Sequence, residues 1–280
     1  MRHLSNLLIT VALAAIAGPA AASLDPPAWT RPIAPFPVIG AIDYVGSEGL
    51  AAYLIHTPAG AILIDGTMEQ NADAVARNIV ARGVKLRDVK LILVSHAHFD
   101  HVGAVAALKR MSGAKLVAGA GDETALDSGI PPGETNYGVV RFPAAHVNRA
   151  VRNGERIALG GVTLTAVATP GHTPGCTSYK MRILQRGKPL DVLFACSLTV
   201  AGNRLVGNRA YPGIVGDFRT SFDRIGALQA DVVLPFHPEM TDLMDRVARH
   251  TLIDRTVLPK MVQDARAAFA VELAKQQKQP

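Results

Sequence analysis

One short segment of the chain concentrates side chains that bind metals. Residues 91–101 read Leu-Ile-Leu-Val-Ser-His-Ala-His-Phe-Asp-His, so an apolar run leads directly into His96, His98, Asp100 and His101. Positions two apart in an extended chain point the same way, which allows His96 and His98 to share one ion. Imidazole and carboxylate ligands together are typical of catalytic zinc. A simpler interpretation makes Asp100 a helix cap, but it does not explain the clustered histidines.

Two later histidines stand in similar surroundings. His172 lies in the sequence Thr-Pro-Gly-His-Thr-Pro-Gly (169–175), and His237 lies in Pro-Phe-His-Pro (235–238). Each follows a short apolar run, and loops at a common sheet edge converge on one point. Either residue alone is more typical of an ordinary loop histidine, but beside the first cluster both are predicted to be ligands. For His146, in the middle segment, we expect a solvated side chain, with a substrate contact as the weaker alternative.

The hydrophobic pattern predicts the elements that position these residues. Strands are expected at 41–45, 51–55, 61–64, 91–94, 115–118, 155–158, 162–168, 177–183, 190–195 and 231–234. Helices are expected at 68–82, 101–111 and 217–228 and after Met240, and residues 120–150 are expected to form loops. Runs of strands followed by helices, twice over, favour two sheets packed face to face with helices outside.

The first 22 residues have the layout of a secretory signal peptide. Arg2 is basic, residues 7–17 form an unbroken apolar run, and Ala20, Ala21 and Ala22 offer a small-residue cleavage site before Ser23. That run is too short to span a bilayer, and no other run is long enough. We therefore expect a periplasmic or secreted protein without stable membrane insertion, in which residues 23–280 form a single domain.

Composition restricts the partners of that domain. The 280 residues are 49% hydrophobic and 19% charged, which suffices for one large core. The formal net charge is +6, but the lysines and arginines are scattered and aromatic residues are few, so we do not expect nucleic-acid binding. We expect a small-molecule substrate; the oligomeric state stays open, and a monomer is favoured.

The two cysteines, Cys176 and Cys196, flank a predicted hairpin. Pairing the strands at 177–183 and 190–195 brings the cysteines nearly opposite each other. Export to an oxidising compartment favours a disulfide, which would stabilise the fold by about 3 kcal/mol in the chain-entropy model. Two buried thiols are the alternative, and the sequence leaves the choice open.

These motifs together resemble the metallo-β-lactamase superfamily over nearly all of the chain after the leader. The similarity includes the stretch Leu-Ile-Asp-Gly (63–66), whose Asp65 would lie behind the ligands. The resemblance implies an α/β fold, a four-layer αβ/βα sandwich of two mixed β-sheets flanked by helices, with two Zn²⁺ ions per chain at its edge. It assigns the first zinc to His96, His98 and His172 and the second zinc to Asp100, His101 and His237.

One position separates the branches of this superfamily. Thioesterases, lactonases and transfer-RNA-processing nucleases commonly carry a metal-bridging aspartate after the strand equivalent to residues 193–195. This chain has Cys196 and Ser197 there, together with His101, which is similar to class B β-lactamases of subclass 3. A role for Cys196 as a soft ligand is a weaker alternative, because histidine and aspartate already complete both sets.

The resemblance implies zinc-dependent hydrolysis of the β-lactam amide bond by a metal-bridging hydroxide, an antibiotic-resistance activity. Asp100 would help to position the hydroxide, and Ser197, Thr199 and Asn203 would bind the substrate carboxylate. For the two hydroxyls, capping of the strand end is an equally simple interpretation. One alternative function is an exported hydrolase of lactones, thioesters or phosphoesters. Another is a zinc-binding protein without catalysis, which the ligand pattern disfavours because structural zinc usually occupies a closed four-ligand site.

Overall fold

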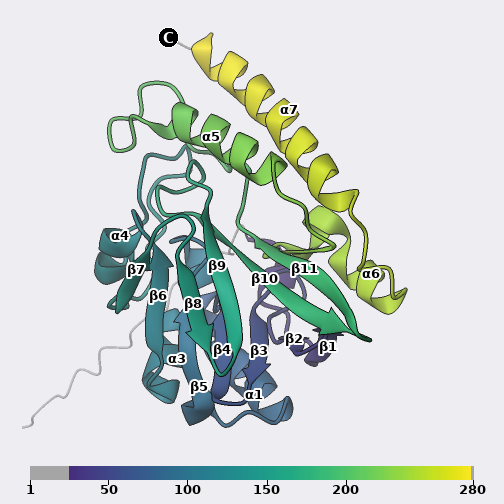
Figure 1. Cartoon of the computed structure of the whole chain (residues 1–280). Helices are drawn as coiled ribbons and strands as arrows, with labels where there is room; N and C mark the ends of the chain where they lie inside the picture. Colours follow the sequence, from purple (N-terminus) through teal and green to yellow (C-terminus); the bar gives the residue numbers. More distant parts are fainter. Residues whose placement is uncertain (1–24, 279–280) are drawn as a thin grey trace, which may run out of the picture.

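Two β-sheets lie face to face in the computed structural model, which describes residues 25–278 (Figure 1). The predicted signal peptide, residues 1–22, lies outside the described residues. The first sheet has seven strands in chain order: β1 (Phe36–Ile39), β2 (Ile42–Tyr44), β3 (Tyr53–Thr57), β4 (Gly60–Ile64), β5 (Val89–Leu93), β6 (Lys115–Gly119) and β7 (Arg149–Val151). The second sheet has five, in the order β12 (Val232–Pro235), β11 (Lys188–Ala195), β10 (Thr177–Gln185), β9 (Val162–Ala168) and β8 (Arg156–Leu159).

The first sheet changes from antiparallel to parallel at β4. Strands β1 to β4 pair antiparallel, and β2, β3 and β4 correspond to the strands expected at 41–45, 51–55 and 61–64, whereas β1 was not expected. Strands β4 to β7 pair in parallel. Helices α1 (Ala72–Ala81), α3 (Val105–Ser112) and α4 (Glu123–Ser128) connect the parallel strands. Residues 62–64 of β4 are wholly buried, as expected of a parallel strand covered on both faces. The carboxyl ends of these strands meet at one edge of the sheet, which is where ligand sites gather in such folds.

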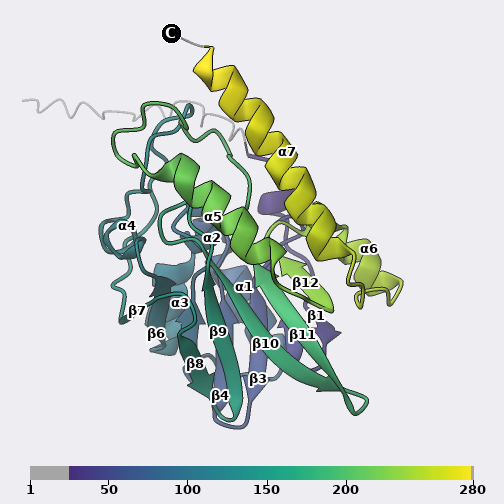
Figure 2. The same ribbon diagram turned by 45° about the horizontal axis from the view of Figure 1, so that its top comes forward.

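The second sheet pairs antiparallel from β8 to β11, and β12 joins β11 in parallel. Between β11 and β12 the chain forms α5 (Ile214–Gly226), and after β12 come α6 (Leu243–Ala248) and α7 (Val257–Gln277). Figure 2 shows α7 running alongside α5 over the outer side of this sheet. Short 3₁₀ turns complete the chain: η1 (Pro27–Trp29), η2 (Glu69–Asn71), η3 (Leu86–Asp88) and η4 (Pro238–Thr241).

Three apolar layers hold the sheets and helices together. Tyr53, Tyr179 and Phe194 are buried between the sheets. A second layer joins the first sheet to α1 and α3, and a third joins the second sheet to α5 and α7. The predicted four-layer αβ/βα sandwich is confirmed. Within residues 25–278, no helix combines the length and the apolar composition that a bilayer crossing requires.

Several predicted helices are interrupted. Instead of one helix at 101–111, the chain forms α2 (Phe99–Val102) and then α3. Between them Gly103 lies against the start of η2, where a Cβ would come within 2.4 Å of the Glu69 backbone nitrogen. The predicted C-terminal helix is divided into η4, α6 and α7, with His250 in the left-handed region after α6. The expectation of loop alone at 120–150 was wrong, because α4 and β7 lie there; both are too short to show periodicity.

Candidate metal centre

The six predicted ligands meet at the edge of the sandwich where three strands end. His96, His98, Asp100 and His101 follow β5, and the last two belong to the single turn of α2. His172 follows β9, and His237 follows β12. Since these strands come from both sheets, the fold brings together three separated segments of the chain around one small volume. We name His96, His98 and His172 set I, and Asp100, His101 and His237 set II.

The donor atoms of set I are as close as ligands of one ion. Nε2 of His172 lies 3.1 Å from Nδ1 of His98 and 3.0 Å from Nε2 of His96. Nitrogens bound tetrahedrally at ~2.0–2.1 Å are separated by about 3.3–3.4 Å, so the observed spacing needs little adjustment around zinc. Set I is therefore a group of three buried imidazoles whose spacing suits a single metal ion.

Set II has the same spacing and contains the only carboxylate among the six ligands. Nε2 of His101 lies 3.1 Å from Nε2 of His237 and 3.2 Å from Oδ2 of Asp100. The same Asp100 oxygen lies 3.3 Å from Nε2 of His237. The two sets adjoin, because the rings of His96 and His101 have centroids 4.1 Å apart.

Hydrogen bonds at the outer ring nitrogens turn lone pairs toward the centre. Nδ1 of His172 donates to the carbonyl of Thr199 at 2.8 Å, which leaves its Nε2 as an acceptor. Ser95 Oγ donates to Asp65 at 2.6 Å and lies 3.0 Å from Nδ1 of His96, so the hydroxyl accepts that N–H. Lone pairs that face one another repel unless a cation lies between them, and outer partners of this kind are typical of metal-ligating histidines.

His98 also indicates a bound cation, because one of its ring nitrogens lacks a hydrogen-bond partner in the described part of the chain. Its ring is buried, and its Nε2 has no hydrogen-bond partner among the described residues. A buried polar atom without a partner costs free energy, so such an orientation needs a compensating interaction. Coordination of an ion by Nδ1, which faces His172, supplies that interaction. The donor set and its geometry fit a bound divalent metal.

The electrostatics of the two sets differ. Burial lowers the pKa of His98 to about 4, and burial together with neighbouring imidazoles holds the pKa of His96 and His172 well below its usual value. Burial alone would also lower the pKa of His101, but Asp100 and Asp65 outweigh it and raise the pKa to about 10. Set I is thus neutral at pH 7, whereas set II is a charged group.

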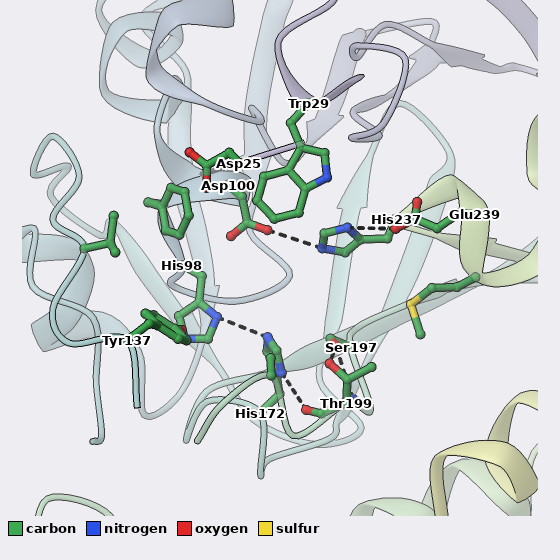
Figure 3. A pocket seen from close by; sticks show the side chains of 14 residues that line it. Asp25, Trp29, His98, Asp100, Tyr137, His172, Ser197, Thr199, His237 and Glu239 are labelled. Carbon is green, nitrogen blue, oxygen red and sulfur yellow. Dashed lines mark hydrogen bonds and ion pairs between the residues drawn. The ribbon is translucent and has the colours of Figure 1, made fainter. Parts of the chain in front are cut away.

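A cavity of about 540 Å³ opens onto both sets (Figure 3). Trp29 forms one wall, and its indole lies against the ring of His237 with centroids 5.4 Å apart. Tyr137, on the loop after α4, lies beside His98 in Figure 3. The other lining residues outside the two sets are Asp25, Phe99, Val140, Ser197, Thr199, Ala201, Glu239 and Met240. None of the described residues that line this cavity is a lysine or an arginine.

The predicted substrate-binding residues fall into two groups. Ser197 and Thr199 line the cavity, and their hydroxyl oxygens lie 2.9 Å apart. Asn203 does not line it; the side chain is buried and its Nδ2 donates to the carbonyl of His172 at 3.0 Å. His146 is exposed and pairs with Asp127 at 3.3 Å, away from the cavity.

Sequence reasoning gave no role in the site to Trp29, Tyr137 or Glu239. Glu239 lies 3.5 Å from Nδ1 of His237, on the 3₁₀ turn that follows the histidine. Trp29 is the only tryptophan in the sequence, and this rarity is a signal that could have singled it out. Tyr137 lies in a segment rich in glycine and proline, where no pattern points to the site.

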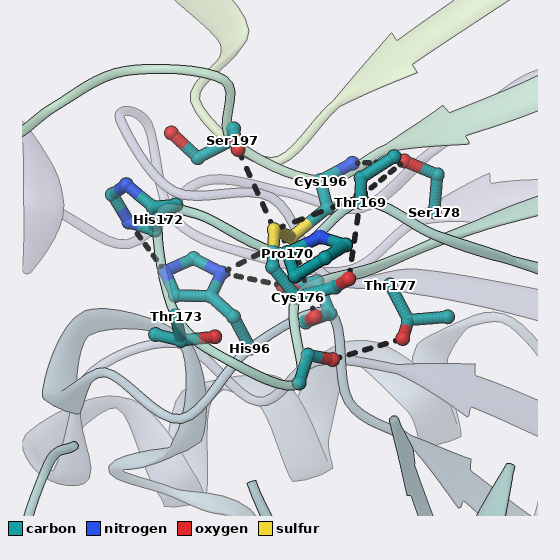
Figure 4. Close-up of a disulfide and its surroundings, with 12 residues drawn as sticks. His96, Thr169, Pro170, His172, Thr173, Cys176, Thr177, Ser178, Cys196 and Ser197 are labelled. Atoms are coloured by element: carbon teal, nitrogen blue, oxygen red, sulfur yellow. Dashed lines mark hydrogen bonds between the residues drawn. A yellow bond between two sulfur atoms is a disulfide. The ribbon is translucent and has the colours of Figure 1, made fainter. Parts of the chain in front are cut away.

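The predicted hairpin of β10 and β11 is confirmed, and it closes a disulfide between Cys176 and Cys196 (Figure 4). Sγ of Cys196 lies 3.8 Å from Nδ1 of His96, whereas the other ring nitrogen, Nε2, faces His172. The sulfur is therefore part of the support behind His96. Because both cysteines are oxidised, the alternative of a soft Cys196 ligand loses its basis.

Comparison with known proteins defines the class. Residues 49–237 match the metallo-beta-lactamase superfamily, and the chain belongs to it. The solved structure of BJP-1, a subclass B3 metallo-beta-lactamase of Bradyrhizobium japonicum, is 42% identical, covers 90% of this chain and 97% of its own, and superposes with a TM-score of 0.86. MEM-A1, a subclass B3 enzyme from a soil metagenome library, is 36% identical, with 90% and 100% covered and a TM-score of 0.85.

A curated relative bears a different name. A hydroxyacylglutathione hydrolase of Bradyrhizobium is 36% identical over 144 residues. The match takes in 51% of this chain and 48% of that relative, so the chain spans about half of the relative's length. The protein is therefore a hydrolase of the metallo-β-lactamase superfamily with a histidine-rich metal site, and its substrate has to be argued from the site itself.

Proposed function

We propose that this protein hydrolyses the amide bond of β-lactams with two zinc ions, one held by each donor set. The observation that carries the proposal is the identity of one residue that lines the cavity together with the two sets. Where superfamily hydrolases of thioesters and lactones commonly place a bridging aspartate, this chain has Ser197, whose hydroxyl lines the cavity beside Thr199. The subclass B3 enzymes of similar fold support the same assignment.

The chain's own groups account for binding and orientation. The hydroxyls of Ser197 and Thr199 donate to the carboxylate that β-lactams carry beside the ring. Burial alone would raise the pKa of Asp100, but His101 and His237 outweigh it and hold the pKa well below its usual value. Asp100 therefore stays ionised and accepts a hydrogen bond from the attacking water. A divalent ion held by these donors would lower the pKa of a bound water to about 7 and would polarise the carbonyl.

Hydrolysis of acylglutathione thioesters is the second candidate, favoured by the curated relatives. Such substrates carry two carboxylates, and a site built for them is expected to offer cationic side chains. Among residues 25–278, none of those that line the cavity is a lysine or an arginine, which supports the β-lactam assignment.

One assay separates the two candidates. The purified protein, with its zinc content measured, is offered a penicillin, a cephalosporin, a carbapenem, a lactone and S-lactoylglutathione, each with and without a chelator. We expect two zinc ions per chain and β-lactam hydrolysis that the chelator abolishes. A kcat/KM for the thioester or lactone at least 100-fold above that of every β-lactam would overturn the proposal, as would β-lactam turnover that survives metal removal.

We also propose that the protein is exported and that residues 23–280 form the mature domain. The basic, apolar and small-residue regions of the first 22 residues support this, and a disulfide is typical of an oxidising compartment. Mass spectrometry of the protein from a periplasmic fraction should give a chain that begins at Ser23. An uncleaved chain confined to the cytosol would contradict the proposal.

A further inference from the structure

One buried carboxylate joins the two loops that carry set I. Asp122 lies just after β6, in the segment where the sequence gave no functional signal, and only 1% of its surface is exposed. Its Oδ2 accepts the backbone N–H of Ala97 at 2.9 Å and the hydroxyl of Thr173 at 2.7 Å. Its Oδ1 accepts the backbone N–H of Gly175 at 2.8 Å.

The partners of this carboxylate are the immediate neighbours of the ligands. Ala97 stands between His96 and His98, and Thr173 follows His172 directly. Asp122 therefore holds the loop after β5 to the loop after β9, although about 75 residues of sequence separate their histidines. All three nitrogens of set I lie on the two loops that this single side chain connects.

The surrounding backbone is built to admit the carboxylate. A Cβ added to Gly175 would lie within 2.6 Å of Asp122 side-chain atoms, and one added to Gly119 would lie 2.0 Å from the Gly175 carbonyl oxygen. Glycine at both positions permits this close approach. Burial raises the pKa of Asp122 to about 6, so the carboxylate is ionised at neutral pH in spite of its position.

A carboxylate, and not an amide, satisfies three donors that converge from two directions. An asparagine offers one oxygen, and its NH₂ group would face a backbone N–H, so at least one buried donor would lose its acceptor. The negative charge also suits its place, because set I supplies no anionic ligand to balance a divalent ion. Hydrogen-bonding groups behind metal ligands commonly change metal affinity by 10- to 100-fold.

We infer that Asp122 is a positioning residue for the metal held by set I, acting through the loops of Ala97 and Thr173. It fixes the separation of His172 from His96 and His98 and has no comparable contact with the loop that carries His237. The inference rests on the proposed metal centre but not on the identity of the substrate.

The test measures metal affinity at one set at a time. In a His237→Ala background, set I is the complete set, and zinc or cobalt(II) titration of the metal-free protein against a chromophoric chelator gives its affinity. We expect Asp122→Asn to weaken this affinity by about 10- to 100-fold and to alter the visible spectrum of the cobalt(II) form. In a His172→Ala background, the affinity of set II should change less than threefold.

Asp231→Asn is the matched control. Asp231 is also a buried carboxylate, which accepts the backbone N–H of Asp191 at 2.8 Å and Nε of Arg255 at 2.6 Å, but it stands just before β12, at the end opposite His237. It should lower the melting temperature and leave both metal affinities unchanged. If Asp122→Asn behaves in the same way, Asp122 is only structural and the inference fails.

A milder variant keeps the inference testable if Asp122→Asn does not fold. Thr173→Val removes one of the three donors and leaves the carboxylate in place. We expect a 3- to 10-fold loss of affinity at set I alone; an unchanged affinity would overturn the inference. Because the readout is metal binding, failure of the β-lactam proposal is recognised separately, as tight binding of two ions without β-lactam turnover.

Discussion

The two donor sets of this site are built on opposite principles. Set I consists of three buried, neutral imidazoles, of which His172 is bonded to the carbonyl of Thr199 and His96 lies against the hydroxyl of Ser95. Set II centres on Asp100, with Asp65 behind His101 and the partly exposed His237 at its margin. The side chain of His237 is 18% exposed, whereas that of His101 is 1% exposed.

From this difference we expect metal affinity to have a different physical origin in each set. In set I, affinity depends on how accurately packed loops hold neutral ligands, so it should respond to changes in packing. In set II, affinity depends on negative charge, so it should respond to protons and to the loss of a carboxylate. Changes that affect only one set test this distinction.

Removal of the Asp100 carboxylate should have the largest effect. Asp100→Ala deletes the charged ligand of set II and the acceptor that orients the water, so we expect kcat/KM for the best β-lactam to fall by about 10³-fold or more. Metal analysis should show one zinc ion per chain, retained at set I. A variant that keeps two ions and near-normal turnover would contradict the dependence of set II on the charge of Asp100.

The control for this variant is Asp127→Ala. Asp127 also forms an Asp–His pair, with His146, but both side chains are exposed and lie away from the cavity. An exposed pair of this kind contributes little to stability, so kcat/KM and zinc content should stay unchanged.

Reduction of the disulfide should act next most strongly, and on set I. The bond between Cys176 and Cys196 closes a 20-residue separation, so its loss should lower the free energy of unfolding by about 3 kcal/mol. Because Cys196 lies against His96, zinc affinity of set I should weaken more than that of set II. Urea unfolding and zinc titration with and without a dithiol reductant measure both effects. Equal weakening at the two sets would remove the distinction.

A change in pH should alter the metal affinity of set II by about tenfold per pH unit and leave that of set I unchanged. Without an ion, the pKa of His101 is about 10, so an ion that binds set II below that pH displaces a proton. From pH 9 down to pH 7, the dissociation constant of set II should therefore rise about tenfold per unit. Set I, whose histidines have lowered pKa values, should not change in this range. Titration of the His172→Ala and His237→Ala variants at several pH values checks both slopes.

The raised pKa of His101 also predicts how the stability of the metal-free protein changes with pH. The pKa of His101 is higher in the folded chain than its ordinary value of about 6.5, so its stabilising contribution is complete below pH 6.5 and is lost as the pH rises toward 10. Urea unfolding of the metal-free protein at pH 7 and pH 9.5 should show the loss. An increase in stability over this interval would contradict the assignment.

The sequence predicted which six side chains converge better than it predicted the contacts that support them. His96, His98, Asp100 and His101 are close in sequence, and His172 and His237 each follow a strand, so chemistry and strand order were sufficient. The sandwich followed from the order of strands and helices. These features depend on short-range patterns, which a single sequence contains.

The supporting contacts depend on tertiary structure and left no such pattern. Asp122 acts on residues about 25 and 51 positions away, and nothing next to it marks it as buried. Asn203 was assigned to the substrate from its closeness in sequence to Ser197, yet it is buried and bonds to the backbone of His172. The division of the helices at Gly103 and His250 likewise results from contacts and turns outside the helices themselves.

The smallest expected effect concerns the side of the cavity that belongs to neither set. Replacing Ser197 by Ala and Thr199 by Val removes two hydroxyls that line the cavity and changes no ligand. Since a hydrogen bond to a charged group contributes about 1.5–3 kcal/mol, and water partly replaces it here, we expect KM to rise about tenfold. The kcat and the zinc content should stay within about twofold, because both donor sets are intact. If kcat falls instead and KM does not move, the hydroxyls support set I, whose His172 bonds to the carbonyl of Thr199, and the substrate carboxylate binds elsewhere.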